Sequence, residues 1–335
     1  MYKTPSTPPQ KQDITLRLCS PRGFCAGVDR AIQIVLLALK KYGAPVYVRH
    51  EIVHNQYVVE ALKEQGAIFI QELEEIPPSH RKKPVVFSAH GVAKSVVAYA
   101  QKHEIFYLDA TCPLVSKVQK QALRHHRLGR RVIVIGHAHH PEVVALIGQL
   151  PKGCVILVEN IEQAKNLTCP EDAALGYVSQ TTLSLQDTQA IIAVLEQRFS
   201  CLAAPAAESI CYATTNRQDA VQSAAKDCAH FFVVGSQNSS NSRRLVEVAK
   251  TAGAAEATLI QSVEDINWAS IKKGDIIGFS AGASAPEILV NTVLKAFKER
   301  YNARLELVQT AIEKESFLVN RELRDIALTS EERLF

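Results

Sequence analysis

Short apolar, β-branched runs alternate with longer segments of helical periodicity along almost the whole chain. The runs predict strands over residues 16–19, 45–49, 67–70, 84–88, 105–108, 131–135, 154–158, 174–179, 230–235, 257–261, 275–280 and 304–308. The segments with one apolar face predict helices over 26–42, 55–65, 92–102, 113–128, 184–198, 213–228, 241–252 and 286–299. Such alternation is typical of α/β units with mostly parallel sheets.

The number of strands per unit length predicts the domain organisation. Each third of the chain holds three or four strands, too few for a large doubly wound domain. We therefore expect three small α/β domains with mostly parallel sheets, over 14–110, 111–208 and 209–300. Residues 1–13, rich in Pro, Thr, Ser and Gln, are expected to be a disordered tail. Residues 301–335 are expected to be an extension with one strand and a charged amphipathic tail.

Composition narrows the function classes. The 335 residues carry a net charge of only +4, with no basic stripe interleaved with aromatic residues, so we expect no nucleic-acid partner. No apolar run approaches the roughly 18–20 residues of a membrane span, so we expect no membrane interaction. The first residues match neither a signal nor a transit peptide. We predict a cytoplasmic protein, whose eight cysteines are thiols or metal ligands and not disulfides.

Three cysteines stand at equivalent places, each in a turn between a predicted strand and a predicted helix. They are Cys25, Cys112 and Cys211, one from each third of the chain. The chain has no Cys-x-x-Cys spacing, which disfavours zinc ribbons, thioredoxin chemistry and common ferredoxin sites. Three convergent thiolates suit an iron–sulfur cluster that leaves one iron open to act as a Lewis acid and electron donor. Zinc held by three cysteines and one histidine remains an alternative on ligand count.

Six further turns after predicted strands concentrate histidines, hydroxyls and amides, over residues 50–55, 89–91, 136–142, 179–182, 236–242 and 281–286. In parallel sheets, ligands bind at the carboxyl ends of the strands, where these turns lie, and helix N-termini there favour anions. Ser240, Asn241 and Ser284 are natural helix caps that can also hold an anion. Glu142, after Pro141 in a first helical turn, is the carboxylic acid placed to deliver a proton. The chain lacks P-loop and dinucleotide fingerprints, so the predicted ligand is another polar, anionic small molecule.

Several motifs together resemble one enzyme family. They cover residues 23–28, 51–55, 88–92, 109–115, 136–137, 140–143, 179–183, 210–218, 235–242 and 281–286, in order, between about residues 16 and 296. The pattern is similar to the LytB-type family of 4-hydroxy-3-methylbut-2-enyl diphosphate reductases. These are the last enzymes of the methylerythritol phosphate route to isoprenoids.

The resemblance implies three α/β domains around a central [4Fe–4S] cluster bound by Cys25, Cys112 and Cys211. The substrate's C4 hydroxyl would bind the open iron, and two electrons and protons would remove it as water, giving isopentenyl and dimethylallyl diphosphate. Reduced flavodoxin or ferredoxin would supply the electrons. Glu142 would donate the proton, and Thr181 would orient the hydroxyl end of the substrate. The resemblance implies that the diphosphate is bound by His54, His90, His140, Ser239, Ser240, Asn241 and Ser284. It implies that His140 is also catalytic. It assigns no role to His137 or His139.

Three other classes stay open on the residues alone. An iron–sulfur sensor without enzymatic activity would not need the six polar turns and usually carries a nucleic-acid-binding face. A zinc-dependent hydrolase would be colourless when loaded with metal. A cysteine-nucleophile acyl or phosphoryl transferase using Cys25 or Cys211 would lose activity on alkylation without any dependence on iron.

Overall fold

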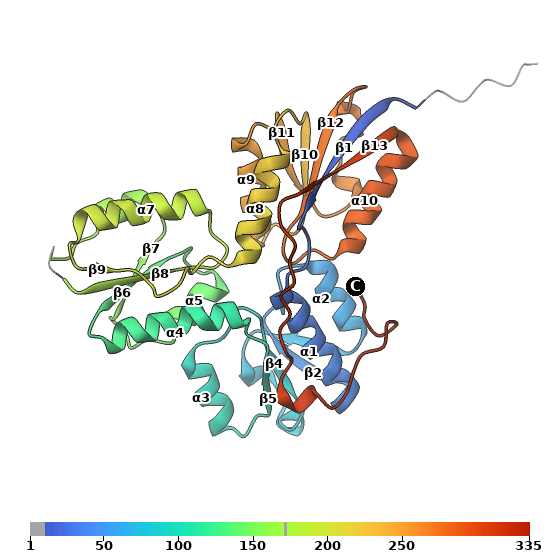
Figure 1. The fold of residues 1–335 in the computed structure, drawn as a ribbon. Coiled ribbons are helices and arrows are strands. Elements are labelled where there is room, and N and C mark those ends of the chain that lie inside the picture. The colour runs from blue at the N-terminus through green and yellow to red at the C-terminus, as the bar shows by residue number, and fades with distance from the viewer. Residues whose placement is uncertain (1–10, 171–172) are drawn as a thin grey trace, which may run out of the picture.

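The structure, a computed structural model, describes residues 11–170 and 173–335. It has three lobes, which meet at the centre of the molecule (Figure 1). Each lobe is built on its own β-sheet, and every strand pair in the three sheets is parallel among the residues described. The predicted fold class, three small α/β domains with mostly parallel sheets, is confirmed.

The first sheet has the order β3-β2-β4-β5 and the second the order β7-β6-β8-β9, while the third has five strands, β11-β10-β12-β1-β13. The strands are β1 (Asp13–Ser20), β2 (Val46–Arg49), β3 (Ala67–Ile70), β4 (Val85–Phe87), β5 (Tyr107–Asp109), β6 (Arg131–Ile135), β7 (Val155–Val158), β8 (Leu175–Ser179), β9 (Leu202–Ala203), β10 (His230–Val234), β11 (Glu256–Ile260), β12 (Ile276–Ala281) and β13 (Asn302–Gln309). The helices are α1 (Ala26–Tyr42), α2 (Gln56–Glu64), α3 (Lys94–Lys102), α4 (Pro113–Arg127), α5 (Pro141–Ile147), α6 (Ile161–Asn166), α7 (Leu185–Arg198), α8 (Tyr212–Ala224), α9 (Ser240–Thr251) and α10 (Glu287–Arg300).

The chain passes from lobe to lobe through equivalent crossovers. The fourth strand in each sheet's order, which is β5, β9 or β1, leads into Cys112, Cys211 or Cys25. Each cysteine then opens a helix that packs in a different lobe: α4 on the second sheet, α8 on the third and α1 on the first. Because each of these connections leads from a strand end in one lobe to a helix of another lobe, the three cysteines lie in the central region where the lobes meet.

The sequence analysis assigned the strand over 16–19 to the unit 14–110, and the structure differs there. This strand, β1, pairs with β12 on one side and β13 on the other, so it belongs to the third sheet. Short apolar strands carry no local signal of their partners, because parallel pairing joins distant segments. The predicted strand over 304–308 is confirmed as β13, whereas α6 and β9 were not among the predicted elements.

Apolar side chains cover both faces of each sheet and form separate cores on the two sides. Sheets that are buried on both faces explain why the strands read as nearly continuous apolar runs. Among the residues described, no helix combines the length and apolarity needed to cross a bilayer.

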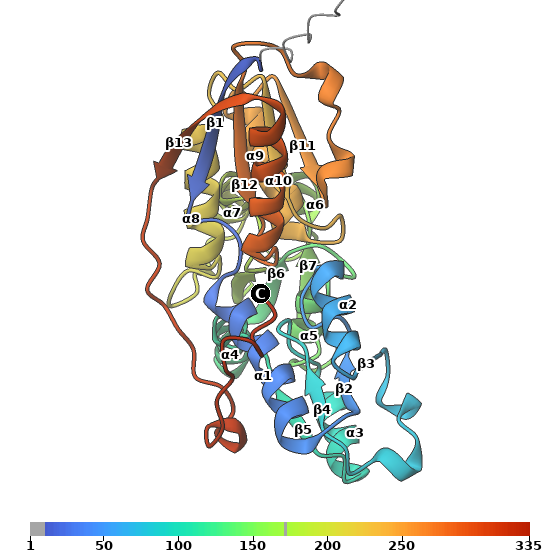
Figure 2. The same cartoon turned by 90° about the vertical axis from the view of Figure 1, so that its right-hand side faces the viewer.

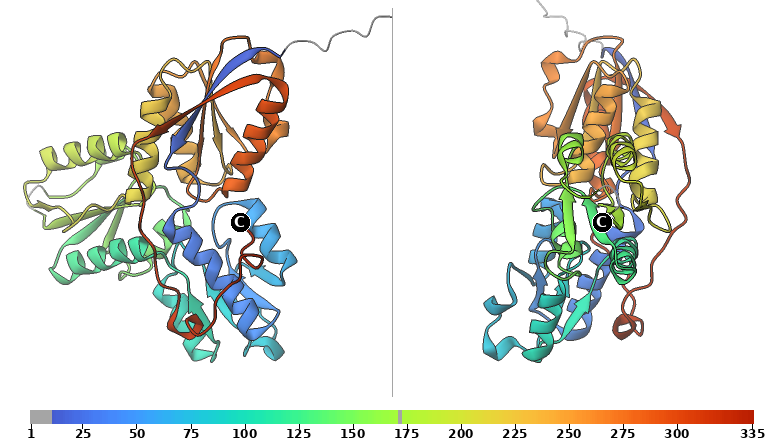
Figure 3. Two further views of the ribbon diagram at one scale, coloured as in Figure 1. Left: turned by 45° about the vertical axis from the view of Figure 1, so that its right-hand side comes forward. Right: turned by 90° about the vertical axis from the view of Figure 1, so that its left-hand side faces the viewer.

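Residues 310–335, which we call the strap, leave β13 in the third lobe and run across to α1 in the first lobe (Figures 2 and 3). Leu323 of the strap is fully buried in the core of the first lobe. The strap therefore joins the two lobes. Residues 1–10 of the predicted N-terminal tail lie outside the described residues, and Asp13 already begins β1.

Candidate active site

A central cavity of about 710 Å³, part of it open to solvent, lies where the three lobes meet. All twelve residues singled out from the sequence line it: Cys25, His54, His90, Cys112, His140, Glu142, Thr181, Cys211, Ser239, Ser240, Asn241 and Ser284. They come from all three lobes, so the cavity exists only when the domains are assembled.

Each of the three cysteines is the N-cap residue of a helix: Cys25 of α1, Cys112 of α4 and Cys211 of α8. The positive ends of three helix dipoles therefore point to the cysteine side of the cavity, where they favour thiolates or an anionic cluster. Burial raises the pKa of Cys112 to about 12 and that of Cys211 to about 11, and the nearby Cys25 adds to both shifts. These thiols hold their protons until a cation replaces them.

The backbone leaves room beside the sulfurs. A Cβ atom added at Gly27 would lie 2.5 Å from Sγ of Cys112 and 3.9 Å from Sγ of Cys25. Both sulfurs thus face the same small space, which only a glycine leaves open. No three His, Cys, Asp or Glu side chains in the described part of the chain are arranged to share a single metal ion. The three sulfurs surround a cavity, and soft thiolates of this number fit an iron–sulfur cluster.

Three imidazoles form a second group in the cavity. The rings of His54 and His90 stack with centroids 4.2 Å apart, and the ring of His140 meets them edge-on at 5.5 and 5.8 Å. Burial, together with the neighbouring imidazoles, lowers the pKa of His140 to about 3 and that of His90 well below its ordinary value. The surroundings of the three rings thus disfavour three positive charges, and a bound anion would reverse that preference.

Hydrogen bonds fix the roles of two ring nitrogens. Nδ1 of His140 accepts from the backbone N–H of Glu142 at 3.2 Å, which leaves Nε2–H as the donor of the neutral ring. Nδ1 of His54 bonds to the Glu51 carboxylate at 3.2 Å, and that carboxylate also accepts from Asn238 of the third lobe. Nε2 of His54 is buried and finds no hydrogen-bond partner among residues 11–170 and 173–335.

The start of α9 supplies hydroxyl and amide groups. Ser239 caps the helix by accepting from the Ser242 N–H at 3.3 Å, and its own hydroxyl hydrogen stays available. Asn241 is 4% exposed, yet neither Nδ2 nor Oδ1 has a partner in the part of the chain described. Two unpaired buried polar atoms are costly, and a ligand in the cavity would satisfy them. Ser284 donates to the His54 carbonyl at 2.9 Å, which ties the third lobe to the first.

Glu142 and Thr181 form a separate pair. The Thr181 N–H and hydroxyl each donate to one oxygen of the Glu142 carboxyl, both at 2.8 Å. Burial raises the pKa of Glu142 to about 7, although the two bonds from Thr181 oppose the shift. A carboxyl with this pKa can hold and release a proton near neutral pH.

Comparisons with known proteins agree with this geometry. A profile of the LytB protein family matches residues 16–298. The chain belongs to the LytB protein family. It is 62% identical over 325 residues to the 4-hydroxy-3-methylbut-2-enyl diphosphate reductase of Rhizobium meliloti (strain 1021), covering 97% of this chain and 93% of the relative. It is 63% identical over 325 residues to the reductase of the same name from Chelativorans sp. (strain BNC1), covering 97% of each chain.

Solved structures give the same assignment. The E-1-hydroxy-2-methyl-but-2-enyl-4-diphosphate reductase of Plasmodium falciparum matches with a TM-score of 0.88 at 34% identity, over 94% of this chain and 97% of that one. A structure of (E)-4-hydroxy-3-methyl-but-2-enyl diphosphate reductase matches with a TM-score of 0.61 at 28% identity, over 86% and 99%.

The cavity of this LytB protein is also lined by residues that the sequence analysis did not assign to a site. Val28, Val53, Leu114 and Val115 are apolar lining residues that lie within the family motifs, but the sequence analysis gave them no role in the site. Thr214 lines the cavity as well, with its hydroxyl 3.3 Å from Sγ of Cys211. Its place three residues after the cysteine, on one helix face, was the available signal. His137 and His139, to which no role was given, do not line the cavity.

Proposed function

We propose that this protein reduces 4-hydroxy-3-methylbut-2-enyl diphosphate to isopentenyl and dimethylallyl diphosphate, the last step of the methylerythritol phosphate pathway. The observation that carries the proposal is the single cavity in which three thiols, three imidazoles and the Glu142–Thr181 pair meet. The names of relatives 62–63% identical over nearly the whole chain support the substrate.

Cys25, Cys112 and Cys211 would hold a [4Fe–4S] cluster, one per chain. The three half-buried thiols at helix N-termini and the opening beside Gly27 suit that cofactor. When bound, the cluster supplies electrons and a Lewis-acidic iron for the substrate's C4 hydroxyl. The chain's own part is to hold the three sulfurs, which release their protons when the cluster binds, and to exclude water with the apolar walls around them.

The diphosphate would occupy the imidazole side of the cavity. It carries several negative charges, so its burial requires multiple donors, some of them cationic. Nε2–H of His140 and the Nδ2 amide of Asn241 can donate to it, and Nε2 of His54, buried without a partner among the described residues, can donate only when that ring carries both protons. The ligand's charge raises the pKa of His90 and His140 from their lowered values, so binding is coupled to proton uptake. Ser239, Ser240 and Ser284 complete the set, and the apolar walls suit the five-carbon chain.

Glu142 would donate the proton that converts the leaving hydroxyl into water. Its carboxyl is 3% exposed, and burial holds its pKa near 7, so the protonated form is present at neutral pH. Thr181 fixes the direction of both carboxyl oxygens through its two hydrogen bonds. The balance is two electrons and two protons taken up, one C–O bond broken, one C–H bond formed and one water released.

The electron donor and the location are part of the same proposal. Reduced flavodoxin or ferredoxin would pass the electrons, in the cytoplasm. The relatives from Rhizobium meliloti and Chelativorans sp. are bacterial proteins, which supports this location.

The test is anaerobic reconstitution with iron and sulfide, followed by visible and Mössbauer spectra with and without the hydroxylated diphosphate. We expect a brown protein with one distinct iron whose signal shifts on substrate addition. With dithionite and a viologen mediator, mass spectrometry should then detect both five-carbon diphosphates. Each Cys→Ser variant at positions 25, 112 and 211 should lose the cluster and the activity.

Contrary outcomes point to the other classes. A colourless, zinc-loaded protein that hydrolyses the substrate would replace the proposal with a zinc hydrolase. Activity that survives iron removal but not alkylation would indicate a cysteine nucleophile. A cluster that does not respond to the diphosphate would favour a sensor.

A further inference from the structure

Arg217 has the largest fully buried side chain in the described part of the molecule, and its exposure is 0%. It lies on α8, the helix that Cys211 opens. Its guanidinium donates to the Gly23 carbonyl through Nε at 3.0 Å and through Nη2 at 2.8 Å. Nη2 also reaches the Phe24 carbonyl at 3.2 Å, directly before Cys25. One side chain thus connects the backbones that carry two of the three cavity cysteines.

Glu313 of the strap completes this contact. Its two carboxylate oxygens accept from Nη1 and Nη2 of Arg217 at 2.8 and 3.2 Å, and Oε1 also accepts from Asn216 at 3.2 Å. The Glu313 side chain is 16% exposed, so the ion pair is largely removed from water. A buried guanidinium without its carboxylate is strongly unfavourable, so the position of Arg217 depends on Glu313.

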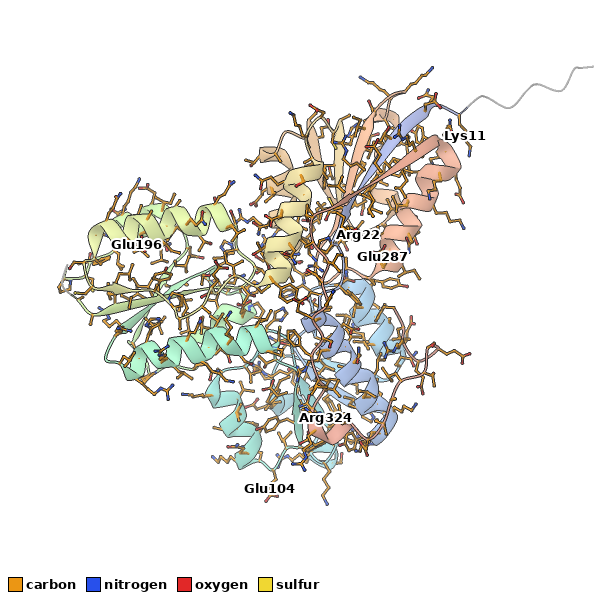
Figure 4. All side chains as sticks on the ribbon, viewed as in Figure 1. Lys11, Arg22, Glu104, Glu196, Glu287 and Arg324 are labelled. Carbon is orange, nitrogen blue, oxygen red and sulfur yellow. The ribbon has the colours of Figure 1, made fainter. Side chains whose placement is uncertain are left out.

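The Cys25 turn is held on both sides of its backbone. Its N–H groups face the third sheet: Gly23 donates to the Ala281 carbonyl at 3.1 Å, and Cys25 donates to the Ala283 carbonyl at 3.3 Å. Its carbonyls at 23 and 24 face Arg217. An ion pair between Arg22 and Glu287 of α10 fixes the start of the same turn (Figure 4).

The strap is itself anchored beyond Glu313. Leu318 accepts from Arg30 of α1 at 2.7 Å, and Lys41 of α1 donates to the Glu322 carbonyl at 2.6 Å. The ring of Phe335 packs edge-on against Phe24 at 5.7 Å. Arg324, labelled in Figure 4, marks the stretch of the strap that lies over the first lobe. Glu313 therefore sits in a short span fixed at both ends, by β13 and by α1.

We propose that Arg217 and Glu313 are positioning residues that set the placement of Cys25 relative to Cys211, and that the strap thereby acts on cluster retention. This inference rests on the proposed cluster. Neither residue lines the cavity, so they act through the backbone of the Cys25 turn. Loss of the carboxylate should loosen this turn and leave the sheets intact.

The experiment compares Glu313→Gln with Glu315→Gln, the same change two residues along, where the strap is exposed. Hydrogen–deuterium exchange followed by mass spectrometry reads the amides of residues 19–28 and, separately, those of the sheet strands. The rate of anaerobic iron release to a chelator measures how firmly the cluster is held. For Glu313→Gln we expect faster exchange confined to the turn and iron release at least about tenfold faster. Glu315→Gln should match wild type, and Arg217→Lys, which keeps charge but loses the fork, should resemble Glu313→Gln.

The outcomes separate the two proposals. Wild-type protein that binds no iron would refute the proposed function, while the exchange comparison would still test the role of the pair. Unchanged exchange in the turn, or iron release equal to wild type, would overturn the inference. Faster exchange throughout the sheet strands would also overturn it, because the pair would then be only a general structural contact. A Glu313→Asp variant, which keeps the charge, should show turn exchange and iron release between those of wild type and Glu313→Gln.

Discussion

Gly27→Ala is the sharpest perturbation of the candidate cluster site, since it adds one methyl group and changes no charge. Gly27 is the second residue of α1, and its backbone is not in the left-handed region, so alanine fits the local conformation. The added Cβ would lie 2.5 Å from Sγ and 3.3 Å from Cβ of Cys112.

The size of the effect follows from these distances. Non-bonded heavy atoms prefer separations of about 3.5–4 Å, so the Cys112 sulfur must move by roughly 1 Å. In metal-free protein the thiol can rotate away at small cost, and alanine in place of glycine stabilises a helix by up to about 1 kcal/mol. A bound cluster permits no such movement, because metal–ligand distances hold to about 0.2 Å. We therefore expect metal-free protein of equal or greater stability and an iron affinity lowered by about ten- to a hundredfold, the size of effect found when groups that support metal ligands are changed.

The assay measures iron and sulfide per chain after identical anaerobic reconstitution, the visible spectrum, and the Tm of the metal-free protein. Ala26→Gly, a neighbouring change of opposite direction that adds no atoms, is the control and should retain its cluster. A Gly27→Ala protein with wild-type iron content and spectrum would refute the placement of a cluster between Cys25 and Cys112. Loss of iron together with a collapsed Tm would contradict the steric argument, because the defect would then lie in folding.

Further predictions concern Glu142, Asn241 and Leu323. Turnover should fall about tenfold per pH unit above the Glu142 pKa of about 7. The Glu142→Gln variant should keep its iron and show low turnover that does not change with pH. Full activity in that variant would remove the proton-donor role. Burial raises the folded-state pKa of Glu142 from 4.5 to about 7, so protonation of this carboxyl stabilises the folded protein fully below pH 4.5, and that stabilisation is lost as pH rises through 7. The free energy of unfolding of wild type should therefore fall relative to that of Glu142→Gln between pH 4.5 and 7. Asn241→Leu, which removes two unpaired polar atoms, should raise KM at least about tenfold and weaken pyrophosphate binding in calorimetry, and an unchanged KM would contradict the diphosphate subsite. Leu323→Ala should lower the free energy of unfolding in urea by about 2–4 kcal/mol, and a loss below about 1 kcal/mol would show that the strap is not packed as described.

Local signals predicted most elements within a few residues. The helix predicted over 26–42 is α1 itself, and the strand over 131–135 is β6. The twelve candidate residues were also found from sequence, since each follows a predicted strand or opens a helix, and a family pattern added their expected roles. Parallel strands place the candidate residues of each sheet at one edge of that sheet, but the meeting of the three edges in one cavity depends on how the lobes assemble. The two-residue β9 carried too short a pattern to be recognised.

The sequence by itself determined the α/β class, the turns that hold the cysteines and the identity of the polar side chains, because those depend on periodicity and on neighbours in the chain. Only the tertiary structure decided that β1 joins the third sheet, that the Glu142 carboxyl is paired with Thr181, and that Arg217 meets Glu313. Each of these is a contact between distant segments. Its strength comes from burial, which changes pKa values and makes an unpaired charge costly, and burial exists only once the lobes have assembled.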